Sequence, residues 1–315
     1  MKKTLAAICT SLSVGCSSQA NNSATENVNT AESFILNGYK ASHKDFPSIG
    51  ALVYDAGMSE LCTVSMIRKD LALTAAHCLI GDFPTTRYLL YGYDKVFKEG
   101  CEECLYPIAV SVAHPKYNEL SGEKNRYDLA LLLLNKEVTS AKPIALLPPT
   151  GFKETLNIKN IVTIAGYGAY KSNAFDFENG KLYAADVPIT GYFNDAEIIV
   201  GEKDPVKGNA CYGDSGGPIY VSFEGKNQLA GVASRIPEKV DGYNQCGYGV
   251  VYGIPSLEKE WIESEYKKIR GKYPLVVPEE INPEIPAGCQ AAPSQATDNL
   301  SWSLLLAAYF LRKKK

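Results

Sequence analysis

Short apolar runs separated by turn-forming residues constrain the fold of this 315-residue chain more than any other feature. Four of these runs lie at 49–54, 88–91, 108–113 and 161–165. Each run has the length of a strand, and Gly, Pro, Asn and Asp separate the runs, which is typical of antiparallel strands joined by turns. One segment, 255–268, carries apolar residues at helical spacing and is predicted to be a helix. The pattern therefore predicts an all-β domain closed by a helix.

The sequence Gly-Asp-Ser-Gly-Gly-Pro at residues 213–218 carries the clearest chemical signal. Glycines around Ser215 favour a tight turn that exposes its hydroxyl and leaves backbone N–H groups free. Acyl transfer needs such a nucleophile, together with N–H donors aimed at the oxyanion that forms on attack. The alternative interpretation is a glycine-rich turn without chemistry.

His77 is the candidate general base for this serine. The chain has three histidines, and histidine is the usual base because its ordinary pKa lies near neutrality. A run of small residues precedes His77 and Cys78 follows it, which sets it apart from the other two. His43 and His114 are interpreted as surface or core residues.

Asp128 is the candidate partner of the histidine. It opens an apolar run, and an ionised carboxylate at the mouth of a buried strand needs a partner. The imidazole N–H of His77 would serve, and would fix the tautomer whose other nitrogen accepts the serine proton. The alternative is a solvated strand start.

In the order His, Asp, Ser, these segments resemble the trypsin/chymotrypsin family of serine endopeptidases over residues 35–270. The resemblance implies two antiparallel six-stranded β-barrels with a C-terminal helix, and a site in the cleft between them. It implies that His77 is the general base, Asp128 its orienting partner and Ser215 the nucleophile. The backbone N–H groups of Gly213 and Ser215 would form the oxyanion hole. A polypeptide substrate is implied, and no cofactor or metal is expected.

Residues 34–38, Phe-Ile-Leu-Asn-Gly, resemble the junction at which the family's inactive precursors are cut. The resemblance implies that the new amino group of Ile35 turns inward and pairs with Asp214, because a buried carboxylate needs a cation. Phe34 stands where Lys or Arg is usual. The expected activating protease is therefore one of chymotrypsin-like preference, or another protease of the host cell.

The same resemblance assigns substrate binding to Asn209, Ser234 and Ile236. Asn209, six residues before the nucleophile, would form the floor of the pocket for the P1 side chain. Cleavage after Arg or Lys normally needs an aspartate there as counter-charge. The segment Ser234-Arg235-Ile236 aligns with a Ser-Trp-Gly wall, so Ile236 would narrow the pocket. A small or medium uncharged P1 side chain is therefore expected.

Nine cysteines indicate an oxidising compartment. The resemblance implies two disulfides, Cys62–Cys78 and Cys211–Cys246. Cys101 and Cys104 are predicted to form a short loop disulfide, with half of a zinc site as the alternative. Several bridges common in animal members of the family have no cysteines here, which favours a bacterial exported branch.

Composition at the two ends of the chain, together with the family resemblance between them, implies five segments. They are a signal peptide at 1–20, a pro-segment at 21–34, the protease domain at 35–272, a Pro-rich linker at 273–299 and a short apolar tail with a basic end at 300–315. Cys16 fits a lipoprotein-type cleavage site, with cleavage near Ala20 without a lipid as the alternative. Cys289 fits a processing site ahead of the tail, with an amphipathic or disordered C-terminal end as the alternative. The termini would then anchor the protein to a membrane.

The compartment and partners follow from these features. The periplasm, the outer-membrane surface or the extracellular space is expected. A net charge of −3 gives no basic field for nucleic acid. Two other functions stay open at this point: a catalytically impaired, protease-like binding protein, and a serine hydrolase that does not act on peptides.

Overall fold

The computed structural model of the chain describes residues 35, 37–54, 59–80, 87–96, 102–118, 126–168, 180–204, 207–237, 239–240, 243–244 and 246–275. All of these residues belong to one unit, Met1–Val276. The predictions for the signal peptide, the pro-segment, most of the linker and the C-terminal tail lie outside the described residues. Within the described residues, no helix has the length and apolar character needed to cross a membrane.

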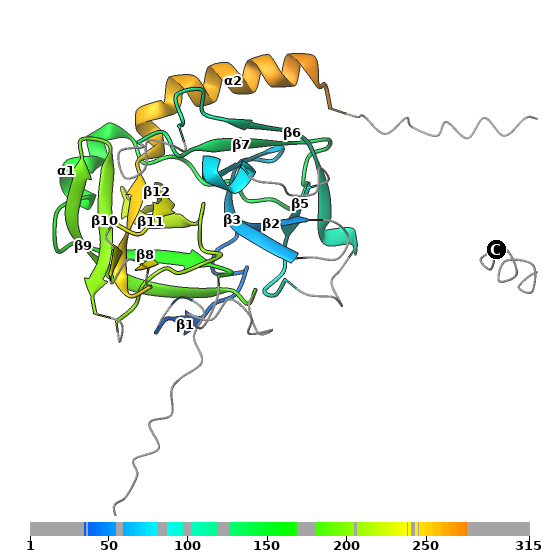
Figure 1. Ribbon diagram of the computed structural model, residues 1–315. Helices are drawn as coiled ribbons and strands as arrows, with labels where there is room; N and C mark the ends of the chain where they lie inside the picture. Colours follow the sequence, from blue (N-terminus) through cyan, green and yellow to red (C-terminus); the bar gives the residue numbers. More distant parts are fainter. Residues whose placement is uncertain are drawn as a thin grey trace, which may run out of the picture. The chain divides into compact units, whose positions relative to one another are not determined.

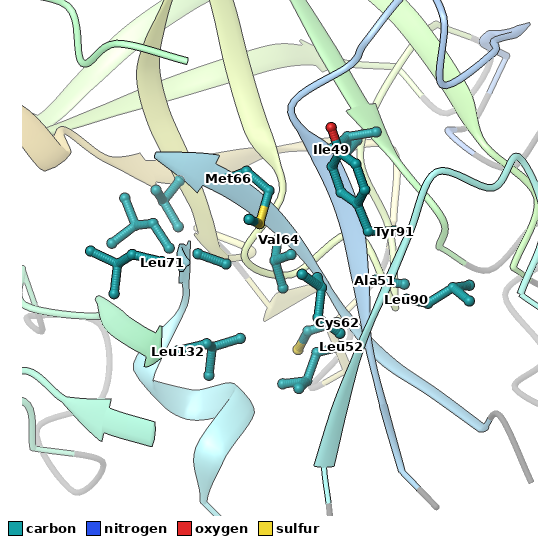
Figure 2. Packing of buried hydrophobic residues seen from close by; sticks show 14 of the residues in the cluster. Ile49, Ala51, Leu52, Cys62, Val64, Met66, Leu71, Leu90, Tyr91 and Leu132 are labelled. Carbon is teal, nitrogen blue, oxygen red and sulfur yellow. The ribbon is translucent and has the colours of Figure 1, made fainter. Parts of the chain in front are cut away.

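The first barrel consists of six antiparallel strands that close in the order β2-β3-β4-β7-β6-β5 (Figure 1). Its strands are β2 (Ile49–Tyr54), β3 (Ser59–Arg68), β4 (Leu71–Thr74), β5 (Arg87–Tyr91), β6 (Leu105–Ala113) and β7 (Ala130–Leu134). The ladder between β2 and β5 closes the barrel, with Gly50 opposite Tyr91. Leu52, Val64 and Leu132 come from three different strands, are fully buried, and belong to one apolar cluster (Figure 2).

The second barrel closes in the order β8-β9-β10-β15-β12-β11, because β8 pairs with both β9 and β11. Its strands are β8 (Ile161–Gly166), β9 (Tyr183–Asn194), β10 (Glu197–Lys203), β11 (Pro218–Phe223), β12 (Lys226–Arg235) and β15 (Tyr248–Gly253). The short strand β1 (Tyr39–Lys40) pairs with β9 as an addition to this barrel. Two six-stranded barrels with a C-terminal helix confirm the predicted fold class, and the four apolar runs lie in β2, β5, β6 and β8.

The other described elements are short, apart from the C-terminal helix. They are the 3₁₀ helices η1 (Ala76–Leu79), η2 (Glu102–Cys104), η4 (Pro149–Gly151) and η5 (Pro255–Glu258), the helices α1 (Phe152–Thr155) and α2 (Lys259–Lys272), and the paired strands β13 (Lys239–Val240) and β14 (Tyr243–Asn244). The predicted helix at 255–268 was therefore wrong at both ends. Its first residues form the 3₁₀ turn η5, where Pro255 favours a helix start, and α2 continues to Lys272.

Helix α2 lies against the first barrel at β7 (Figure 1). Part-buried polar contacts near the C-terminal end of the helix hold it there. Arg270 Nη2 lies 2.7 Å from the Asp70 carboxylate, and the Tyr266 hydroxyl donates to the same carboxylate at 2.9 Å. Asp70 lies between β3 and β4 and is buried. The pairing explains why the helix runs past the last residue that its apolar pattern predicts.

Candidate active site

His77 and Asp128 face each other from two adjacent loops of the first barrel. His77 lies in η1, just after β4, and Asp128 lies just before β7, which pairs with β4. His77 Nδ1 is 2.8 Å from Asp128 Oδ2, and the backbone N–H of His77 donates to Asp128 Oδ1 at 2.9 Å. A carboxylate only accepts hydrogen bonds, so Nδ1 carries the hydrogen and Nε2 of the neutral ring is an acceptor.

Asp128 is held as a buried carboxylate. The residue is 7% exposed, and burial by itself acts to raise its pKa. The hydrogen bonds and charge of His77, and the Ser234 hydroxyl that donates at 2.6 Å, outweigh burial and leave the pKa below its usual range. Ser234 belongs to β12, so a side chain of the second barrel completes the carboxylate's hydrogen bonds. The sequence-based prediction placed Ser234 in the pocket wall and missed this contact.

Ser215 lies on a turn whose backbone favours glycine. Gly213 and Gly216 have φ angles of 88° and 77°, in the left-handed region. A Cβ at Gly216 would lie 2.0 Å from Thr74 Oγ1. Thr63 in β3 holds the turn, because its N–H donates to the Ser215 carbonyl at 2.8 Å and its hydroxyl donates to the Gly213 carbonyl at 3.0 Å.

A disulfide links β3, whose Thr63 contacts the Ser215 turn, to η1, which carries His77. Cys62, the neighbour of Thr63, is bonded to Cys78, the neighbour of His77, with a Cα–Cα distance of 6.2 Å. Ser215 and His77 are both described, and their side chains make no hydrogen bond to each other. His77 Nε2 instead lies 3.8 Å from Cys78 Sγ. Proton transfer therefore requires the hydroxyl and Nε2 to reach hydrogen-bond distance when a substrate is bound.

Asp214 is buried directly beside the nucleophile. Its carboxylate accepts the N–H of Gly168 at 3.0 Å and the N–H of Cys211 at 2.8 Å, and burial raises its pKa to about 7. No Lys, Arg or His side chain pairs with it among the residues that the structure describes. Gly168 is required at its position, because a Cβ there would lie 2.5 Å from Asp214 Cγ. Ile35, the predicted partner, is fully buried in the apolar core of the second barrel.

Asn209, the predicted pocket floor, is fully buried and its amide is occupied by surrounding backbone. Nδ2 donates to the Glu202 carbonyl in β10 at 3.1 Å, and Oδ1 accepts the N–H of Gly249 in β15 at 3.1 Å. The amide thus braces two strands and brings no charge. Ile236 follows β12 directly and is partly buried.

The predicted cysteine pairs are confirmed where they can be seen. Among the residues that the structure describes, Cys62 is bonded to Cys78 and Cys211 to Cys246. Cys101 lies outside the described residues, so its pairing with Cys104 stays a prediction. The sulfur atoms of Cys62 and Cys78 and a ring nitrogen of His77 lie within 4.8 Å of one another. They do not fit a metal, because the two sulfurs are bonded to each other and offer no thiolate.

Two charged residues beside this site were missed by the sequence analysis. Arg235 Nη1 donates to the Ser234 hydroxyl at 3.1 Å, and the guanidinium makes two hydrogen bonds of 2.6 and 3.0 Å to Glu197 in β10. A signal for Glu197 was present, because it opens an apolar run just as Asp128 does. A carboxylate in that position needs a partner.

Comparison with known proteins gives matches over the two barrels. A family model described as Trypsin matches residues 35–261. Chymotrypsin-like elastase family member 1 of Homo sapiens is 27% identical over 253 residues, which cover 76% of this chain and 95% of that protein. The protein of the same name from Canis lupus familiaris is 28% identical, with the same coverage. Trypsin zeta of Drosophila erecta is 26% identical over 261 residues, which cover 73% of this chain and 84% of that protein. These relatives are animal proteins, so the bacterial branch stays a prediction.

Proposed function

Since the chain belongs to the trypsin family of serine endopeptidases, we propose that it hydrolyses polypeptide substrates through an acyl-enzyme, with Ser215 as the nucleophile. His77 is the general base and Asp128 its orienting partner. The observation that carries this proposal is the 2.8 Å contact between His77 Nδ1 and the buried Asp128 carboxylate. This contact leaves Nε2 of the ring as the proton acceptor.

The reaction proceeds in two halves. The Ser215 hydroxyl attacks the scissile carbonyl carbon while His77 Nε2 takes its proton, and Asp128 stabilises the imidazolium that forms. The backbone N–H groups of Gly213 and Ser215 donate to the oxyanion. His77 then gives the proton to the leaving amine as the C–N bond breaks, which leaves an ester on Ser215. Water attacks this ester by the same route, releases the acid and restores the serine.

Activation is proposed to require a cut between Phe34 and Ile35 by an activating protease. The new α-amino group would be the cation for Asp214, whose pKa of about 7 in the uncut chain reflects a buried carboxyl without one. Asp214 stands between Gly213 and Ser215, so its pairing would shape the loop that carries the oxyanion donors. Because Phe34 precedes the bond, the activator would be a protease of chymotrypsin-like preference or another protease of the host cell.

The preferred P1 side chain is proposed to be small or medium and uncharged. Asn209 brings no charge to the pocket, and its amide oxygen and nitrogen are both bound to backbone. Ile236 stands where the family pattern has glycine and would narrow the pocket. A P1 library profile of the activated protein tests this proposal, and dominant cleavage after Arg or Lys would contradict it.

Export to the periplasm, the outer-membrane surface or the extracellular space is proposed from the basic and apolar start of the chain. The two disulfides support an oxidising compartment. Modification of Cys16 or Cys289, both outside the described residues, would add anchoring to a membrane. N-terminal sequencing and the intact mass of protein from native membranes test both points.

Ser215→Ala tests the proposed chemistry. Peptide hydrolysis is expected to fall on the order of a million-fold, and a second change, His77→Ala, is expected to add little, because the triad acts as a unit. A fluorophosphonate is expected to label the wild type and not Ser215→Ala. Ser222→Ala, at an exposed position of β11, is the matched control and should keep full activity. Full activity in Ser215→Ala would contradict the proposal, and cleavage of short esters without cleavage of casein would favour the non-peptidase alternative.

A further inference from the structure

We propose that Arg235 and Glu197 are a pair of positioning residues that act on Asp128 through the Ser234 hydroxyl. The inference rests on the proposed function, because it concerns the same histidine and carboxylate. Its basis is a continuous line of hydrogen bonds that starts at His77 and ends at Glu197.

Each hydrogen along this line has a defined direction. The Ser234 hydroxyl lies 2.6 Å from Asp128 Oδ2 and 3.1 Å from Arg235 Nη1. A carboxylate only accepts and a guanidinium only donates, so the single hydroxyl hydrogen points at Asp128 while the oxygen accepts from the arginine. The arginine therefore fixes the orientation of the hydroxyl that completes the Asp128 site.

Glu197 holds the guanidinium in place. Its side chain is 1% exposed, and its two oxygens accept from Nη1 and Nη2 of Arg235 at 2.6 and 3.0 Å. The Asn194 amide donates to the same carboxylate, and the Phe193 ring centroid lies 4.8 Å from the arginine Cζ. The two-fold pairing and the ring fix the plane of the guanidinium, so that Nη1 stays aimed at Ser234.

The pair also sets the charge next to Asp128. Along the line, Arg235 stands between Ser234 and Glu197, so its positive charge is nearer to Asp128 than the negative charge that balances it. Among the described residues, the charged groups along this line are His77 from η1, Arg235 from β12 and Glu197 from β10. A nearby cation and a polarised hydroxyl both stabilise the Asp128 carboxylate and make it a weaker acceptor. The proton on His77 is therefore held less strongly with the pair than without it.

The pair is a feature of this chain and departs from the family pattern, in which tryptophan follows the serine. An indole carries no charge and needs no buried acid beside it. Arg235 and Glu197 are 38 residues apart and come from strands that both pair with β15. A buried charge without its partner is strongly unfavourable, so the two residues form one functional unit.

The test uses four forms of the full activated protein. The wild type is compared with the charge-free variant Arg235→Gln/Glu197→Gln, and the same comparison is repeated in proteins that also carry Ser234→Ala. The matched control is Arg270→Gln/Asp70→Asn, which removes a comparably buried arginine–carboxylate pair at helix α2. Its side chains are 16% and 5% exposed, against 18% and 1% for the proposed pair. If the charge-free variant only lost stability, it would resemble the control, whose melting temperature should also fall.

Two readouts separate a positioning role from a purely structural one. The first is the pH midpoint of the His77 titration, followed by NMR in the Ser215→Ala background to prevent self-digestion; the chain has only three histidines to assign. The second is the acid limb of the kcat/KM profile. Both midpoints are expected to rise by about half a pH unit in the charge-free variant. The rise should be clearly smaller when Ser234 is already alanine, and the control should leave both midpoints unchanged.

An equal rise with and without Ser234, or no rise at all, would overturn the inference. A wild type that no fluorophosphonate labels would contradict the proposed function, and the NMR midpoints would still decide the inference separately. If the charge-free variant does not fold, Arg235→Lys replaces it. Lysine keeps the charge beside Glu197 but lacks the fork that reaches two partners, so the His77 midpoint should again rise, and an unchanged midpoint would overturn the inference.

Discussion

At the scale of single residues, Asp214 is expected to make the stability of the uncut chain fall as pH rises. Burial raises its pKa to about 7, whereas an unfolded aspartate has a pKa of about 3.9. Between these values the folded chain binds more protons than the unfolded chain. The stability due to this group is therefore complete below about pH 3.9 and is lost as pH rises to about 7, by at most about 1.4 kcal/mol per pH unit. Urea unfolding of the uncut Ser215→Ala protein should show this fall, and Asp214→Asn should remove it.

The cut protein is the control for this prediction. Once the amino group of Ile35 pairs with Asp214, the carboxylate is stabilised and its pKa falls. The same decrease in the free energy of unfolding should then be absent. A decrease of equal size in the cut and uncut proteins would contradict the proposed pairing.

Asn209→Asp is expected to weaken the fold and not to create a pocket for basic side chains. Nδ2 of Asn209 donates to the Glu202 carbonyl, and an aspartate would place an acceptor there instead. A buried acceptor that loses its donor costs about 1–3 kcal/mol. The variant should therefore melt at a lower temperature without gaining cleavage after Arg or Lys.

The exposed amide of Asn227 in β12 offers the matched control for this change. Asn227→Asp should leave the melting temperature and the P1 profile unchanged, because its side chain is exposed. A stable Asn209→Asp variant that cleaves after Arg or Lys would show that the amide does not act as a brace.

The residues of the site were predictable where a short motif carries them. The turn around Ser215 needs left-handed backbone at Gly213 and Gly216. These glycines are close neighbours of the serine in the sequence, so a short motif was enough to predict the turn. Arg235 and Glu197 could not be paired in the same way. Their contact depends on which strands become neighbours in the second barrel, and no local pattern contains that information.

At the scale of elements, His114 joins helix α2 to the segment ahead of β7. Its buried ring stacks on Tyr127, with 4.7 Å between centroids, and lies 4.4 Å from the ring of Trp261 in α2. Nδ1 accepts the N–H of Lys116 at 3.2 Å, and Nε2 lies 3.3 Å from the Glu258 carboxylate. A neutral ring with its hydrogen on Nε2 satisfies both contacts.

Acid is expected to loosen this junction. Burial lowers the pKa of His114 by more than the Glu258 carboxylate raises it, whereas an unfolded histidine titrates near 6.5. Stability from the neutral ring is therefore complete above about pH 6.5 and is lost as pH falls through the lowered pKa. His114→Phe keeps the stacking and cannot titrate. The melting temperature of this variant, relative to that of the wild type, should therefore increase as pH falls from 8 to 5. A difference that does not change with pH would contradict this role.

The apolar pattern located the elements better than it located their ends. The runs in β2, β5 and β8 are recognisable because most of their side chains are buried, whereas the run in β6 is half-buried along its length. Strand β9 alternates buried and exposed positions and includes Pro188, so no apolar run marks it. Helix α2 outlasts its apolar face because Arg270 binds Asp70, a residue 200 positions away.

At the scale of the whole molecule, the candidate site is assembled from both barrels. Asp128 belongs to the first barrel and accepts a hydrogen bond from Ser234 of the second. Ser215 lies just ahead of β11 in the second barrel, and Thr63 of the first barrel holds its carbonyl. The geometry of the site therefore depends on how firmly the barrels are joined.

Loss of the Cys62–Cys78 disulfide is expected to reduce turnover as well as stability. Cys62→Ala/Cys78→Ala opens a loop with a sequence separation of 16 residues, which costs about 3 kcal/mol. The helix η1, which carries His77, also loses its covalent link to β3, whose Thr63 contacts the Ser215 turn. We therefore expect kcat to fall at temperatures where circular dichroism shows a folded protein. Cys211→Ala/Cys246→Ala is the matched control and should act mainly on KM. An unchanged kcat in the folded Cys62/Cys78 variant would contradict this link.

Because neither barrel holds a complete site, we expect that the molecule can be divided into two fragments that are each inactive. A break in the connection between β7 and β8 would leave His77 and Asp128 on one fragment, and Ser215 and Ser234 on the other. Two unrelated proteins fused to the fragments would then report their own encounter by turnover of a peptide. The hydrogen bond from Ser234 to Asp128, which crosses from one fragment to the other, would serve as the contact that switches such a reporter on.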